Sequence, residues 1–460
     1  MKKSLKPLLS LESIIFYSIS SLIVYALIYN LFHYDPILGY DGEAHHAYVQ
    51  NFLNIYIPGK TNQPASNFTY EFFSPPLPYV LPTIVNETCK SFSVAVDYLE
   101  FCQNVYGFIN IIFLSLAYLS LLFIYMKIVK KILGSNNIQS SITLLVLGLF
   151  STNYKAISMI RAEIYILFLS ALLIYRLLLL IEKSYVFNTR DVLIFGSIIG
   201  LLALSRQWAF LLFPAYFIIF FFIEKKNKKN YFQFLTYSFM VGFTISSWFY
   251  FGLYLDYGSF TSFNMEATSF STSNQTLTFF TSSSYFFSKP IRPYFENSFF
   301  PILYSDLWGD YWGYFSFTSR SLDSGRNQLL IGDYLGRVNI VSIFPSLLLL
   351  LGFMKSLKSI NFKKKTTLDF LYIYIVFGII FSLFGYLWFL TTYPETTGDT
   401  IKSTYIIQMF HLLGLATVIY LEKLKINKSY FYNIIQISLL IVFIHNFQTM
   451  LSHFPKIDLF

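Results

Sequence analysis

The chain has 460 residues, of which 55% are hydrophobic and only 12% are charged. Soluble domains carry about 25% charged residues, so this composition excludes an ordinary soluble protein and indicates a membrane protein. The net charge of +9 does not indicate nucleic-acid binding, because the positive residues stand in short clusters between apolar runs, as orientation signals do.

Apolar runs that are long enough to cross a bilayer recur along the chain, since a span needs roughly 20 residues. We therefore expect an all-α polytopic membrane protein. The runs predict eleven spans, of which the third, fifth and sixth are short. The predicted spans are residues 11–32, 105–126, 138–154, 156–181, 191–205, 208–223, 232–256, 338–354, 368–390, 403–421 and 431–451.

The connections between these spans alternate in charge. The N-terminus reads MKKSLK, and every even-numbered connection is basic, as in KIVKKILG and KSLKSINFKKKT. The positive-inside rule assigns these segments to the cytoplasm, so the odd connections are predicted to be extracytoplasmic. We divide the chain into a transmembrane module at 1–256 with an outer loop at 33–104, a large extracytoplasmic loop at 257–337, and C-terminal helices at 338–460.

The segment GYDGEAHHAYVQNF, which begins at Gly39, places Asp41, Glu43, His45 and His46 just outside the first span. One carboxylate there can act as a general base on a hydroxyl group while the other positions a substrate. Alternatively, the acids cap a short amphipathic helix, AHHAYVQNFLNIY. Adjacent histidines on a helix point about 100° apart and rarely chelate together, so we predict neither a metal nor another cofactor.

Two other features of the first outer loop leave alternatives open. Cys89 and Cys102 lie in the same loop, where they form either one bridge or two free thiols. Consecutive prolines in FSPPLPYVLP (residues 73–82) fix an extended entry to the segment that follows. They can shape a cavity wall or simply make a rigid turn into a re-entrant helix.

Arg161, Glu163 and Arg206 lie inside or at the rim of apolar segments on the predicted outer side, and Lys402 lies in an outer turn. Charges in such places are costly and usually face a cavity or a partner. Arginine makes forked hydrogen bonds to phosphate oxygens. Glu163 could instead neutralise Arg161, and an arginine at a rim often only snorkels to the surface. Together the three cations favour an anionic phosphate ligand.

The segment LYSDLWGDYWGYF (residues 303–315) alternates acids with tryptophans near the end of the second long loop. Asp306, Trp308, Asp310 and Trp312 suit a sugar site, in which rings stack on the sugar and carboxylates bind its hydroxyl groups. The alternative is an aromatic belt at the membrane interface, where Trp and Tyr are favoured.

In combination, these motifs resemble the GT-C glycosyltransferases, integral membrane enzymes that use lipid-phosphate-linked sugars. YDGEAHH is similar to the Asp-x-Glu-Ala pattern in the first outer loop of the dolichyl-phosphate-glucose-dependent glucosyltransferases. SPPLPY is similar to a Pro-Pro-Leu element that they share with the aminoarabinose and mannosyl transferases. RAEIYILFLSALLIY and GLLALSRQWAFLLFP look like their intramembrane acidic segment and arginine-bearing turn. YSDLWGDYWGYF and GDTIKSTY resemble stretches of bacterial members of unassigned specificity.

The resemblance implies an inverting transfer of a sugar from a polyprenyl-phosphate donor to a glycan, lipid or protein acceptor. Asp41 would be the general base and Glu43 would support it, although the two could exchange roles. Arg206, Arg161 and Lys402 would bind the donor phosphate. His45, His46 and Glu163 would contact the acceptor or the sugar, together with the acids and tryptophans of residues 306–312.

The lysine pattern predicts a multi-pass protein with a cytoplasmic N-terminus and an extracytoplasmic site, and the high usage of Lys, Asn, Ile and Phe suggests a bacterial inner or plasma membrane. Two rival functions remain. A transporter or flippase would carry its charges at the bilayer midplane and on repeats, which we do not find. A polysaccharide polymerase of the O-antigen type would rely on arginine-rich outer loops rather than on an acidic motif after the first span.

Overall fold

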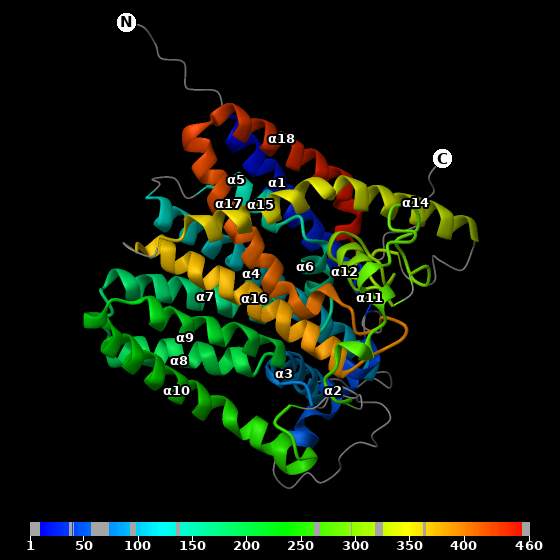
Figure 1. Ribbon diagram of the computed structural model, residues 1–460. Helices are drawn as coiled ribbons and strands as arrows, with labels where there is room; N and C mark the ends of the chain where they lie inside the picture. Colours follow the sequence, from blue (N-terminus) through cyan, green and yellow to red (C-terminus); the bar gives the residue numbers. More distant parts are fainter. Residues whose placement is uncertain are drawn as a thin grey trace, which may run out of the picture.

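The computed structural model describes residues 10–35, 39, 41–56, 73–92, 98–134, 139–261, 267–295, 297–317, 325–361 and 365–452. Within these ranges the chain is helical and contains no strand (Figure 1). Parts of both predicted outer loops, at 57–72, 93–97, 262–266 and 318–324, lie outside the described residues.

The described helices have the following bounds. In chain order they are α1 (Leu11–Phe32), α2 (Gly42–Tyr56), α3 (Leu77–Phe92), α4 (Tyr98–Leu133), α5 (Ser141–Leu147), α6 (Ser151–Ile157), α7 (Glu163–Glu182), α8 (Thr189–Ala203), η1 (Gln207–Leu212), α9 (Phe213–Phe222), α10 (Lys225–Tyr257), η2 (Thr272–Asn274), α11 (Leu277–Thr281), α12 (Phe299–Trp308), α14 (Gly325–Val341), α15 (Ile343–Ser359), α16 (Thr367–Thr392), η3 (Ser403–Ile406), α17 (Ile407–Asn427), α18 (Ser429–Asn446) and η4 (Phe447–Met450).

Eight helical segments in the described part of the chain are long and apolar enough to cross a membrane. They correspond to eight of the eleven predicted spans, all except the third, fifth and sixth, and this is the fold expected of a polytopic membrane protein. The eight segments are Leu11–Phe32, Glu100–Leu133, Glu163–Glu182, Lys225–Asp256, Leu330–Ser359, Thr367–Thr392, Ser403–Asn427 and Ser429–Met450.

The three short predicted spans are helical but fall below this length. Residues 138–154 form no single helix: α5 ends at Leu147 and α6 begins at Ser151, and every residue of both helices is buried. Their apolar character therefore reflects burial against other helices. Residues 191–205 correspond to α8, which has 15 residues, and residues 208–223 form η1 followed by α9.

The start of the fourth predicted span also differs from the prediction. Helix α7 begins at Glu163, and residues 158–162 form an irregular connection after α6. Arg161 thus lies in this connection and not within a helix. It is nevertheless 2% exposed, because the surrounding helices cover it.

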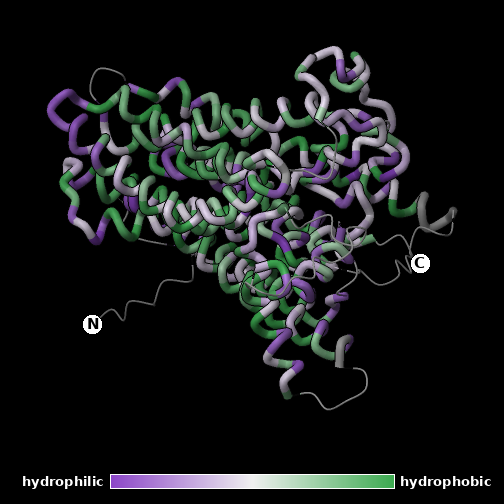
Figure 2. The backbone as a smooth tube through the Cα atoms, turned by 90° about the horizontal axis from the view of Figure 1, so that it is seen from below, coloured by the Kyte–Doolittle hydropathy of each residue, from purple (hydrophilic) through white to green (hydrophobic). Residues whose placement is uncertain are grey.

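Contacts between lysines and acids gather the basic connections at one end of the bundle, which we call the basic end. Lys131 in the last turn of α4 pairs with Glu182 at the end of α7 at 2.5 Å. Lys425 in α17 pairs with Glu12 in α1, and Ser140 before α5 donates to Glu422 of α17 at 2.6 Å. The long helices carry hydrophobic residues along much of their length and hydrophilic residues at many end turns (Figure 2).

The predicted functional residues lie at the opposite end of the same helices. Asp41 follows α1, Glu163 begins α7, Arg206 lies between α8 and η1, and Lys402 lies between α16 and η3. Since α1 and α7 have their other ends at the basic end, the two sets of charges are separated by the length of the bundle.

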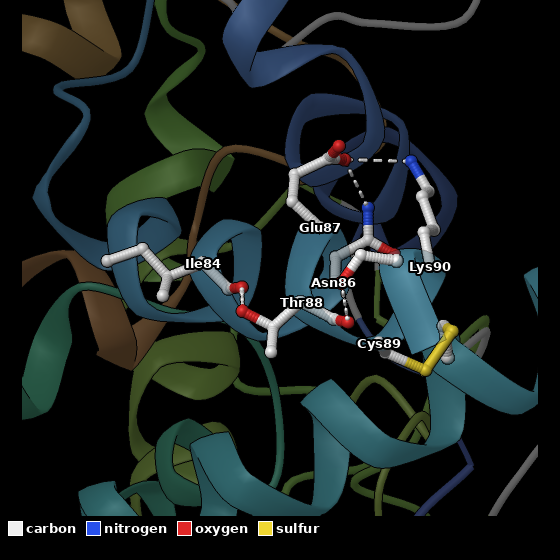
Figure 3. The surroundings of a disulfide bond; sticks show 8 residues. Ile84, Asn86, Glu87, Thr88, Cys89 and Lys90 are labelled. Atoms are coloured by element: carbon white, nitrogen blue, oxygen red, sulfur yellow. Dashed lines mark hydrogen bonds and ion pairs between the residues drawn. A yellow bond between two sulfur atoms is a disulfide. The ribbon is translucent and has the colours of Figure 1, made fainter. Parts of the chain in front are cut away.

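The first outer loop folds into α2 and α3, which lie close together beneath the bundle in Figure 1. A disulfide bond joins Cys89 of α3 to Cys102 of α4, so the two cysteines form a bridge (Figure 3). Buried Pro75 and Pro76 precede α3, and the Leu77 amide donates to the Leu204 carbonyl at 3.0 Å. The proline segment thereby docks the start of α3 against the turn after α8.

One hydrophobic core runs through most of the bundle. Its members extend from Ile15 in α1 to Leu451 near the end of the described chain, and they include residues of all three predicted parts. There are two smaller hydrophobic clusters. One joins α2, α3 and α4, and the other joins α8 and α10.

Candidate functional site

Asp41 and Lys402 form the first ion pair of the candidate site, in which Asp41 is the more exposed partner. The Lys402 Nζ atom donates to Asp41 Oδ2 at 3.3 Å, and the two side chains are 11% and 45% exposed. Asp41 has a φ of 54°, in the left-handed region. Few residues other than glycine adopt this conformation, and it clusters at functional sites. Its carbonyl group accepts from the His45 amide at 3.1 Å, so the first turn of α2 holds it there.

Arg206 and Glu163 form a second, deeper pair. Arg206 Nη1 donates to Glu163 Oε1 at 2.7 Å, and the side chains are 12% and 0% exposed. Glu163 is the first residue of α7, where a negative charge also interacts well with the helix dipole. The sequence left open whether Glu163 neutralises Arg161, and the structure pairs it with Arg206.

The Tyr405 ring joins these two pairs. The Arg206 guanidinium lies 4.9 Å from the centre of this ring and the Lys402 ammonium lies 5.6 Å from it. Trp208 stacks on Tyr405, with centroids 5.3 Å apart and planes at 23°. Cations are attracted to the faces of aromatic rings, so Tyr405 and Trp208 form a support beneath both cations.

His45 lies behind the two pairs, within the electrostatic reach of Arg161, Asp41, Arg206 and Glu163. It is 4% exposed, and its Nδ1 atom lies 2.7 Å from Tyr79 Oη on α3. Its Nε2 atom is buried without a hydrogen-bond partner among the described residues. The site therefore contains three cations, two carboxylates and one imidazole nitrogen with spare hydrogen-bonding capacity.

Charge and burial set the ionisation of this group. Burial raises the pKa of Asp41, but the positive charges of Lys402 and Arg161 outweigh burial and bring this pKa down to about 2. Burial lowers the pKa of His45 well below its usual value, and Arg161 lowers it too, so the imidazole is neutral. Burial lowers the pKa of Lys402, but Tyr405 and Asp41 outweigh it, so the net shift is upward and the amine stays charged.

The remaining residues of the GYDGEAHH motif have different surroundings. His46 is 5% exposed, with Nδ1 at 2.8 Å from Tyr106 Oη and Nε2 at 3.2 Å from Tyr34 Oη. Both of its nitrogens thus have phenol partners, which tie α2 to α4. Glu43 is an exposed residue in the first turn of α2. Asp41 and His45 are therefore the members of the motif that the structure brings to the charged cluster.

Asp306, Trp308, Asp310 and Trp312 are buried, with exposures of 0%, 1%, 0% and 4%. Asp306 binds Lys155 at 2.7 Å, and Asp310 accepts from the Phe317 amide at 3.0 Å. The Trp312 indole donates to the Ile401 carbonyl at 3.2 Å, and Trp308 packs against Phe150. These side chains hold the second loop against the bundle, and their assignment to sugar binding stays a prediction.

Sequence reasoning missed three residues that shape the cluster: Tyr405, Tyr79 and Lys155. A lone tyrosine in an apolar context gives no signal, and 37 tyrosines make each one uninformative. Lys155 did carry a signal, because a lysine between two apolar runs must find a partner. In the described part of the chain, no three His, Cys, Asp or Glu side chains converge closely enough to hold a metal ion.

In comparisons with known proteins, no protein-family model and no curated protein matches this chain. The geometry of the charged cluster and the motifs that form it are therefore the basis for assigning a function.

Proposed function

We propose that the chain is an inverting glycosyltransferase of the GT-C type, embedded in a membrane, which transfers a sugar from a polyprenyl-phosphate donor to an acceptor hydroxyl group. The observation that carries the proposal is the convergence of Asp41 with Arg161, Arg206 and Lys402 at one end of an apolar helical bundle. An exposed carboxylate beside a group of cations supplies both a base and a phosphate site.

In the proposed reaction, the acceptor oxygen attacks the anomeric carbon of the sugar and its proton passes to the Asp41 carboxylate. The bond from the anomeric carbon to the phosphate oxygen breaks at the same time, and polyprenyl phosphate leaves with the electron pair. The leaving phosphate gains negative charge, so preorganised cations stabilise the transition state. Arg206 and Lys402, which share the Tyr405 ring, are suitably placed for this role.

An apolar cavity of about 260 Å³, lined by residues of α8, η1 and α10, supports a lipid-linked donor. Its lining includes Ala203 and Phe210, which flank Arg206 in the chain, and Phe243 and Phe251 of α10. Phe243 and Phe251 are 60% and 47% exposed, so the cavity wall continues onto the outer surface of a candidate membrane helix. In the proposal, the isoprenoid chain lies in this cavity and its phosphate meets Arg206.

Two observations support an extracytoplasmic location for the cluster. Positive-inside orientation assigns the basic end to the cytoplasm and the cluster to the other side. The Cys89–Cys102 disulfide lies in the loop after α1, the segment that also carries Asp41. Disulfides persist in oxidising compartments and are rare in the cytosol, so the bridge favours the same orientation.

The test is to incubate the purified protein with a panel of radiolabelled polyprenyl-phosphate sugars and to measure transfer to added membrane glycolipids and release to water. We expect wild type to consume one donor in the panel. Consumption of none of them, together with translocation of a lipid-linked glycan in liposomes, would favour a transporter instead.

A further inference from the structure

A buried ion pair lies behind the candidate site. Lys155 of α6 and Asp306 of α12 are both 0% exposed, and Lys155 Nζ lies 2.7 Å from Asp306 Oδ1. The amine also donates to the carbonyl groups of Asp306 at 2.6 Å and Gly309 at 3.2 Å. Buried ion pairs are weak sources of stability, because the desolvation of both charges offsets their attraction. A specific geometric role explains this pair better than stability does.

The second oxygen of Asp306 reaches the chain beside Lys402. Asp306 Oδ2 accepts from the Ser403 amide at 2.7 Å and from the Ser403 hydroxyl at 2.6 Å. Thr152 of α6 lies 2.7 Å from the same hydroxyl group. Because Lys155 occupies the other oxygen, the carboxylate cannot rotate without breaking one of these contacts.

The backbone on the other side of Lys402 is anchored as well. The Lys402 amide donates to Tyr386 Oη at 2.8 Å, and this hydroxyl donates to the Thr400 carbonyl at 2.9 Å. The Ile401 carbonyl accepts from the Trp312 indole. Lys402 therefore projects from a turn that is fixed on both sides, and its long, flexible side chain starts from a defined point.

We propose that the Lys155–Asp306 pair is a positioning device for Lys402, which fixes the turn at Ser403 so that the amine is aimed at the anionic ligand. The inference rests on the proposed function, in which Lys402 contacts the carrier phosphate. In this proposal, Asp306 and Trp312 act through Lys402 and not by direct contact with sugar.

The test is a double-mutant cycle that uses farnesyl phosphate, a short polyprenyl monophosphate, as the probe. Lys155→Met/Asp306→Leu removes both charges together, so neither is left buried alone. We expect this variant and Lys402→Met each to weaken farnesyl phosphate binding about tenfold, and their combination to bind no more weakly than Lys402→Met does. Affinity for uncharged farnesol should not change. Additive losses, or an equal loss of farnesol binding, would overturn the inference.

Two further variants guard against a folding artefact. Ser403→Ala keeps the ion pair and the Ser403 amide bond to Asp306 but removes the hydroxyl contacts to Asp306 and Thr152, so it should weaken binding in the same direction but less. Lys131→Met/Glu182→Leu removes an ion pair at the basic end and should leave farnesyl phosphate binding unchanged.

A second readout does not depend on the ligand. Cys89 and Cys102 are bridged, so a Lys402→Cys thiol can be labelled selectively by a cationic methanethiosulfonate reagent. We expect labelling to be about tenfold faster when the Lys155–Asp306 pair is also replaced, because the turn then moves. Equal labelling rates would overturn the positioning role. If wild type binds no farnesyl phosphate, the proposed function fails and this labelling comparison still decides the positioning role.

Discussion

The Lys402 ammonium group lies 3.3 Å from the Asp41 carboxylate, which stands 361 positions earlier in the chain. The pair joins the first outer loop to the turn between α16 and α17, and it places the proposed base beside a proposed phosphate ligand. A phosphate that binds Lys402 competes with Asp41 for the amine. Donor binding would therefore weaken the Lys402–Asp41 ion pair and make the carboxylate a stronger base.

The pH dependence of kcat/KM tests this pairing. The Asp41 pKa of about 2 keeps the carboxylate ionised in the free enzyme, so its protonation should not limit kcat/KM between about pH 5 and 8. Lys402→Met removes the charge that lowers this pKa most, so the pKa rises. We expect the acid limb of the profile to move to higher pH in this variant. An unchanged acid limb would show that Lys402 does not control the base.

The Arg206–Glu163 pair should affect stability and ligand binding separately. Arg206→Gln leaves Glu163 at 0% exposure without its partner, and breaking such a pair typically costs about 3–5 kcal/mol. The double variant Arg206→Gln/Glu163→Gln should recover much of this stability and still bind farnesyl phosphate weakly. Thermal unfolding and binding titrations measure the two effects. Recovery of binding together with stability would remove Arg206 from the phosphate site.

Reduction of the Cys89–Cys102 bridge should destabilise the first outer loop. The bridge closes a segment with a sequence separation of 13, for which loop-closure entropy gives roughly 3 kcal/mol. We expect reductant to lower the unfolding midpoint of wild type and to have no effect on the Cys89→Ser/Cys102→Ser variant. Because α3 carries Tyr79, the partner of His45, the same treatment should also reduce ligand affinity. An unchanged midpoint after complete reduction would contradict the expectation.

The orientation of the bundle can be tested with single thiols on intact cells. Lys226 at the basic end is 77% exposed, and Asp399 in the turn before Lys402 is 50% exposed. A membrane-impermeant maleimide added from outside should label Asp399→Cys and leave Lys226→Cys unlabelled until the membrane is permeabilised. The reverse pattern would place the charged cluster in the cytoplasm.

The long apolar runs predicted eight helices correctly because their length alone separates them from other elements. The short runs could not be separated in this way. Residues 138–154 are as apolar as a span, but Gly148 lies between α5 and α6, and burial among other helices imposes the same composition as lipid does.

Much of the charged cluster was also predictable, because a charge in an apolar context must be explained by a partner or a ligand. The sequence could not show which of these charged residues pair with one another. Glu163 lies two positions from Arg161 and 43 from Arg206, yet it pairs with Arg206, because the turn after α8 meets the start of α7. Asp306 likewise is a charged residue in a predicted outer loop that is completely buried, which only the packing of α12 against α6 reveals.

Asp41 is the proposed base at a phosphate-binding site, so its substitution should separate sugar transfer from ligand binding. Sugar transfer and farnesyl phosphate binding are measured on Asp41→Asn, with Glu43→Gln for comparison and Asp399→Asn as the matched control. We predict that Asp41→Asn binds the probe at least as well as wild type and loses transfer by about 10²–10⁴-fold, the usual contribution of a general base. Undiminished transfer by Asp41→Asn would contradict the account.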